Sequence, residues 1–102
     1  MTFLEKLREK NVKRCNEVFH LFEEWEPWDW SNAMAGEAGE VCNFTKKLRR
    51  GDAVLFSSIE DEIADVIIYA DLLAASLKID LKKAITNKFN SVSRKRSSNI
   101  LI

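Results

Sequence analysis

Two pairs of carboxylates are the residues in this sequence best suited to chemistry. Glu37 and Glu40 lie three positions apart in "EAGE", and Glu62 and Asp65 repeat that spacing in "EIAD" after a gap of 21 residues. Residues three apart on a helix lie side by side, with Cβ atoms about 5–6 Å apart. Each pair would therefore direct its oxygens to one place, as a cation site requires.

If the two helices pack antiparallel, the pairs meet and form a site for a hard divalent cation. Four converging carboxylates repel one another, which raises some of their pKa values. Mg²⁺ removes that repulsion, takes oxygen ligands at about 2.0–2.1 Å and is usually shared with substrate phosphates. The alternative is that the acids are solvated helix residues, as we expect for Glu60 and Asp61 in a first helical turn. Asp65 and Asp71 fit that alternative poorly, because "IADVIIYAD" surrounds both with apolar residues.

Four helices are expected to position these acids, because apolar residues recur at helical spacing along most of the chain. Asp29 or Ser31 is expected to cap the second helix, Ser57 or Ser58 the third, and Asp80 the fourth. The expected ranges are about 2–24, 32–50, 57–77 and 81–93, followed by a tail over 93–102.

These elements predict an all-α fold, a four-helix antiparallel bundle that forms a single domain over residues 1–102. The short "KID" connection predicts that the third and fourth helices are antiparallel neighbours. From Ile63 to Leu77 the third helix is apolar on nearly every face, which is typical of a helix buried all round. Because a bundle of this size cannot surround one helix, we expect a partner chain to complete it as a homodimer or homotetramer.

The overall composition excludes several functional classes. Lys plus Arg equals Asp plus Glu, 16 of each, so no basic excess indicates binding to a nucleic acid polymer. No apolar run reaches the ~20 residues that span a bilayer, and the acid-containing start "MTFLEKLREKNVKR" is unlike a signal peptide. Cys15 and Cys42 are isolated, which favours two free thiols. We therefore expect a cytoplasmic protein without membrane association.

The sequence resembles one known family. "GEAGEVCNFTKKLRRG", followed by "EDEIADVIIYADLLAASLKIDLKKAITNKFNSVSRK", is similar to the MazG-like branch of the all-α nucleoside triphosphate pyrophosphohydrolases, whose mark is ExxE, a spacer and ExxD. The resemblance covers roughly residues 25–96. It implies a dimeric or tetrameric enzyme that uses Mg²⁺, or Mn²⁺ in its place, to convert a (d)NTP and water to the monophosphate and pyrophosphate. It also implies a role in removing unwanted or non-standard nucleotides.

The resemblance assigns roles to individual residues. Glu37, Glu40, Glu62 and Asp65 match the catalytic metal ligands, although Glu37 or Glu40 could instead orient or deprotonate the attacking water. The substrate-contacting candidates from the resemblance are Tyr69 and Lys88, the lysine being expected near the phosphates. Relatives carry an asparagine where this chain has Val92, so Asn87 or Asn90 would have to take its place.

Other residues are candidates for substrate contact from their position and chemistry. Asn43 and Lys46 follow Glu40 by one and two turns and are candidates for the phosphates, although positive charge also suits a helix end. Of the three tryptophans before "EAGE", Trp30 is the candidate to stack on a nucleobase, with Asn32 bonding a base edge or the sugar. The alternative role of a tryptophan is as an anchor in the core or an interface.

Two rival functions remain open from the sequence. One is a sister activity on the same fold, a dUTP or phosphoribosyl-ATP pyrophosphatase. The other is a non-catalytic helical regulator that binds nucleotide without turning it over.

Overall fold

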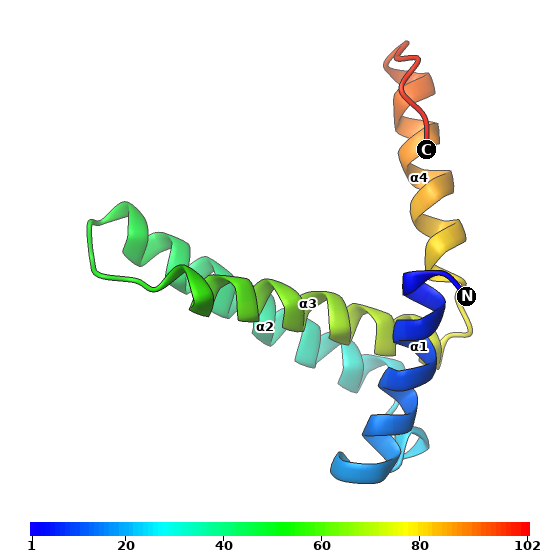
Figure 1. Ribbon diagram of the computed structural model, residues 1–102, viewed down its shortest axis with the longest axis horizontal. Coiled ribbons are helices and arrows are strands. Elements are labelled where there is room, and N and C mark those ends of the chain that lie inside the picture. Colours follow the sequence, from blue (N-terminus) through cyan, green and yellow to red (C-terminus); the bar gives the residue numbers. More distant parts are fainter.

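Four α-helices dominate the computed structural model, which describes residues 1–102 (Figure 1). A π-helical turn and a 3₁₀ turn join the first helix to the second, and no strand is present, so the all-α prediction is confirmed. The elements in chain order are α1 (Phe3–Arg14), the π-turn (Cys15–Phe19), the 3₁₀ turn (Phe22–Glu24), α2 (Pro27–Arg49), α3 (Phe56–Ser76) and α4 (Leu81–Lys95).

Local side chains set where several helices begin. The Thr2 hydroxyl accepts the Glu5 N–H at the start of α1, and Asp80 accepts the Lys83 N–H at the start of α4, as predicted. Helix α2 begins earlier than predicted, because Pro27 supplies a preset helical φ at its first position. Helix α3 begins at Phe56 without a side-chain cap, so the predicted serine cap is wrong.

Helices α2 and α3 form an antiparallel hairpin that is the main body of the molecule (Figure 1). The chain reverses over residues 50–55, where Gly51 adopts φ +86°, a conformation that costs glycine little. The predicted antiparallel packing of the two acid-bearing helices is therefore confirmed. It brings the "EAGE" and "EIAD" segments onto facing helices.

The small apolar core lies where α1 crosses the C-terminal half of α3. Cys15, Trp30 and Leu72 are buried there. Beside them, the fully buried Asp71 accepts hydrogen bonds from Arg8 Nε at 2.9 Å and from Asn11 Nδ2 at 3.1 Å. Asp71 therefore ties α3 to α1.

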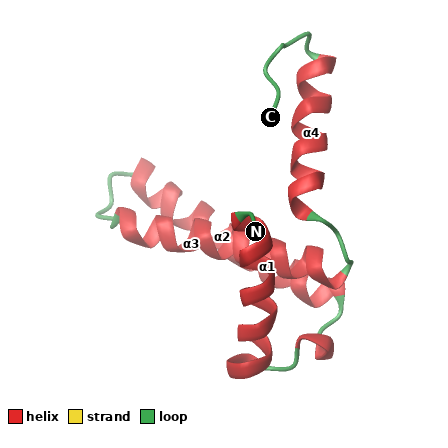
Figure 2. Cartoon of the chain, turned by 45° about the vertical axis from the view of Figure 1, so that its right-hand side comes forward, coloured by secondary structure: helices red, strands yellow, loops and turns green.

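Helix α4 does not run back along α3, so the prediction that these two helices are neighbours is wrong within one chain (Figures 1 and 2). Lys78 takes the left-handed conformation, and the N–H groups of Ile79 and Lys78 bond to Ala74 and Ala75. This cap ends α3 and directs the chain away from the hairpin. The predicted tail is partly helical, since α4 continues to Lys95.

None of the helices combines the length and hydropathy that crossing a membrane requires.

Candidate metal centre

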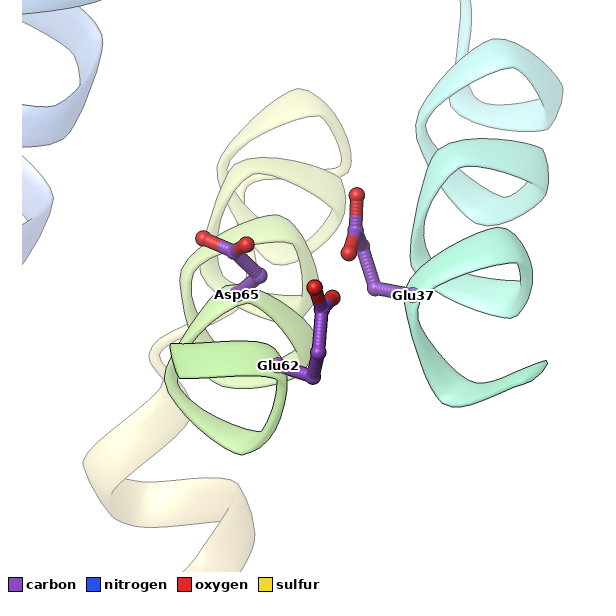
Figure 3. A group of neighbouring side chains, drawn as sticks. All are labelled: Glu37, Glu62 and Asp65. Carbon is purple, nitrogen blue, oxygen red and sulfur yellow. The ribbon is translucent and has the colours of Figure 1, made fainter. Parts of the chain in front are cut away.

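Three of the four predicted carboxylates meet in the groove between α2 and α3 (Figure 3). Glu62 and Asp65 of α3 lie near Glu37 of α2, and one oxygen from each of the three lies within 4.8 Å of the others. Two oxygens bound to the same Mg²⁺ lie at most about 4.2 Å apart, twice the metal–oxygen distance. Small side-chain rotations would therefore close this group on one ion.

The chemistry of the group also fits a cation. None of the three carboxylates is in an ion pair with lysine or arginine. Oε2 of Glu62 is covered by protein atoms and has no hydrogen-bond partner, which is costly for an acceptor that carries charge. A proton or a cation bound at this group would compensate Glu62.

The pKa of Glu62 also reflects the lack of a positive partner. Its pKa is raised above the ordinary value of 4.5, first by hydrogen bonding to the Glu37 carboxyl, then by desolvation, and then by the charges of Glu37 and Asp61. Two carboxylates can share a hydrogen bond only when one holds a proton. A cation bound between the two carboxylates would make such a proton unnecessary.

Glu40 is not part of this group. It is exposed on α2, one turn beyond Glu37, and the structure brings together only Glu37, Glu62 and Asp65. Residues three apart differ by about 60° around a helix axis. The α3 helix packs on the side of α2 that carries Glu37, so Glu40 faces water.

An aromatic cavity of about 290 Å³ adjoins the acidic group. Asp65 lies at its boundary and so belongs to both, while Tyr69 and Trp30 form part of its wall. The remaining lining residues come from α1, the π-turn, the segment after it and α3: Asn11, Arg14, Cys15, Phe19, His20, Trp25, Ile68 and Leu72.

Trp30 is both a core residue and a wall of the cavity. It is 2% exposed and its Nε1 has no hydrogen-bond partner. Its ring packs against Trp25 with centroids 4.6 Å apart and against Tyr69 at 6.4 Å. A buried N–H without an acceptor is costly, and no group of this chain accepts from Trp30 Nε1.

Tyr69 connects the cavity to the carboxylates. Burial, followed by the charges of Glu37 and Asp65, raises the pKa of its hydroxyl above the ordinary value. The phenol therefore stays protonated and can donate a hydrogen bond to an anion beside the acidic group.

The other predicted substrate residues lie outside both the acidic group and the cavity lining. Asn32, Asn43 and Lys46 are exposed on α2. Lys88 is exposed on α4, and Asn90 bonds the backbone of Ile102 through both amide atoms, at 2.9 and 3.0 Å. Within one chain, Asn90 therefore holds the C-terminal segment.

Sequence reasoning missed the contribution of the π-turn and the segment after it. His20 stacks on Trp25 at 4.5 Å and on Trp30 at 5.6 Å. The buried Cys15 donates to the His20 carbonyl at 3.2 Å. The spacing of residues in the sequence does not predict these contacts, because they depend on a π-helical turn that interrupts the helical periodicity.

Comparisons with known proteins identify no family for this chain. No family model matches it, and no curated protein matches it.

Proposed function

We propose that this chain is a Mg²⁺-dependent nucleoside triphosphate pyrophosphohydrolase, as the MazG-like resemblance implies. It would convert a (d)NTP and water to the monophosphate and pyrophosphate and so remove unwanted or non-standard nucleotides. The observation that carries the proposal is that Glu37, Glu62 and Asp65 come together from two helices. None of the three forms an ion pair with a lysine or arginine.

In this proposal the three carboxylates hold the cation, with Mn²⁺ able to replace Mg²⁺. When bound, the ion would neutralise charge on phosphate oxygens and make a coordinated water a better nucleophile. Glu40 lies outside the three-carboxylate group, and in this proposal it would orient a water or take its proton, as the resemblance allows. Tyr69 would donate its hydroxyl hydrogen to a phosphate oxygen.

The aromatic cavity supports a nucleotide as the substrate. Its volume, about 290 Å³, lies just below the ~300–1,000 Å³ typical of ligand pockets, which suits a single nucleobase. Trp25 and Trp30 offer aromatic surfaces, and Trp30 Nε1 offers a free donor to a base acceptor. Because Asp65 borders both sites, a base in the cavity would leave its phosphates near the carboxylates.

We also propose that the working form is a homodimer or homotetramer, in which a second chain completes a helical bundle. Lys88 and Asn90 are not needed for the proposed site within one chain.

The test is to incubate the protein with Mg²⁺ and a panel of dNTPs, NTPs and damaged nucleotides and to resolve the products by anion exchange. We expect monophosphate and pyrophosphate, with none formed in a chelator. Glu62→Gln and Asp65→Asn should each lower kcat/KM by more than roughly 100-fold, because outer-shell changes alone cost 10–100-fold at metal sites.

Glu60→Gln is the matched control, because Glu60 is an exposed acid on the same helix and lies outside the group. It should retain wild-type turnover.

Glu40→Gln tests whether Glu40 is a metal ligand or a general base. Loss of turnover with unchanged Mn²⁺ binding would identify it as a base. Nucleotide binding without turnover of any substrate would contradict the enzyme and favour the regulator, and a strict preference for dUTP or phosphoribosyl-ATP would favour a sister activity.

A further inference from the structure

Two helices of this chain carry apolar rows that no part of the same chain covers. On α4, Ile85, Phe89 and Val92 share one face and are each between 42% and 45% exposed. On α3, Phe56, Ile63 and Ile67 share another face and are each at least 49% exposed. We refer to these sets as the α4 row and the α3 row. Both have the i, i+3, i+4, i+7 type of spacing by which amphipathic helices pack.

The exposed area is large enough to need a partner. The chain exposes 7594 Å², whereas a compact monomer of 11.8 kDa exposes about 5,900 Å². The excess of roughly 1,700 Å² per chain exceeds the ~800 Å² that each partner buries in a standard interface. The radius of gyration, 16.2 Å, likewise exceeds the ~13 Å of a compact domain of this length.

Charge decides which rows pair. On α3, Glu62 and Asp65 belong to the group beside α2 and Asp71 is buried, which leaves Glu60 and Asp61 as exposed acids on a helix without a basic residue. Helix α4 carries five basic residues and no acid. Each row includes one of these charges, since Glu60 lies between Phe56 and Ile63 and Lys88 lies between Ile85 and Val92. Pairing α3 with α3, or α4 with α4, would bring like charges together, which is unfavourable. Pairing α3 with α4 joins opposite charges along two apolar rows.

The α4 of the same chain is held away from its own α3. The cap at Lys78 fixes the direction in which α4 leaves α3. The start of α4 lies near α1, where Leu4 and Arg8 line one pocket together with Ile79 and Leu81. The α3 row is therefore left open to the α4 row of a second copy.

We propose that two copies of this chain exchange their α4 helices reciprocally, with the α4 row of each packing on the α3 row of the other. The arrangement is isologous, so two identical contacts form around one two-fold axis. Lys88 of one copy then faces the acidic α3 of the other. This assembly rests on exposed rows and charges and does not depend on the proposed hydrolysis.

The test begins with sedimentation equilibrium of the full chain. We expect twice the monomer mass for the wild type. Phe89→Asp, in the α4 row, and Ile63→Lys, in the α3 row, should each give monomers. Asn87→Asp and Ser57→Lys introduce the same charges at exposed positions off the rows and should remain dimeric. Circular dichroism shows whether each variant keeps its helices.

Mixing the two monomeric variants provides the decisive result. A mixed pair keeps one intact contact, formed by the α4 row of the Ile63→Lys chain and the α3 row of the Phe89→Asp chain. In its other contact the introduced Lys and Asp face each other. Dimers should therefore form only in the mixture. A monomeric wild type, dimeric single variants, or a mixture that stays monomeric would each overturn the exchange.

Discussion

Glu62 on α3 faces Glu37 on α2 across the helical hairpin, and no hydrogen-bond donor reaches the buried Oε2 of Glu62 (Figure 3). Facing carboxylates destabilise a helix pair unless something positive lies between them. Binding of a proton or of a divalent cation at this pair should therefore change the stability of the fold.

Thermal stability should depend on pH through Glu62. Its pKa in the folded chain lies above the ordinary 4.5, so the protonated carboxyl favours the folded state. That contribution is fully present below pH 4.5 and is lost as the pH rises through the raised pKa. In a chelator, the Tm of the wild type should therefore fall from pH 4.5 upward relative to that of Glu62→Gln.

Divalent cations should reverse this loss at neutral pH. Mg²⁺ or Mn²⁺ at 100 times its Kd should stabilise the wild type by about 2.7 kcal/mol, because only the folded chain presents the site. Differential scanning calorimetry with and without the ion measures the effect. Glu60→Gln should respond like the wild type, and an equal response in Glu62→Gln would contradict the metal site.

Arg8 should stabilise the fold by compensating Asp71. Arg8→Met leaves the buried Asp71 carboxylate with only the Asn11 amide, and breaking such a pair costs about 3–5 kcal/mol. The double variant Arg8→Met with Asp71→Leu should recover part of this loss, because neither charge is then buried. Urea unfolding measures both, and the exposed Lys10→Met should stay within about 0.5 kcal/mol of wild type. Equal losses in the single and double variants would show that the uncompensated Asp71 charge does not cause the loss.

Trp30→Phe should weaken nucleotide binding by about 3–10-fold, because it removes a donor whose hydrogen bond contributes about 0.5–1.5 kcal/mol. Isothermal titration calorimetry measures affinity, and thermal unfolding reports separately on the loss of ring volume. Trp28→Phe is the matched control, since Trp28 is 64% exposed and lies outside the cavity lining. Equal affinities for both variants would exclude the cavity as the base site.

Tyr69→Phe should separate phosphate binding from metal binding. The hydroxyl lies within the influence of Glu37 and Asp65 but is not one of the grouped carboxylates. We expect roughly 10–100-fold weaker triphosphate binding, because a hydrogen bond to a charged group contributes about 1.5–3 kcal/mol. Mn²⁺ affinity, followed by electron paramagnetic resonance, should be unchanged. A parallel loss of Mn²⁺ affinity would place Tyr69 in the metal site instead.

Local chemistry determined the features that the sequence predicted correctly. Apolar periodicity and the Asp80 cap act within a few residues, so they indicated the helices and the start of α4. The i, i+3 spacing brought Glu62 and Asp65 together on one surface of α3, and the free state of Cys15 and Cys42 agreed with their isolation. These features depend on backbone geometry that repeats with every turn.

The contacts between distant segments were decided only by the tertiary structure. It brought Glu37, and not Glu40, close to Glu62 and Asp65, because α3 packs on the side of α2 that carries Glu37 and leaves Glu40 exposed. It paired Asp71 with Arg8, 63 positions away, and it brought His20 into an aromatic cavity through the π-turn. It also turned α4 away from its own α3. Contacts between distant segments follow from how whole helices pack, and no spacing within one helix encodes them.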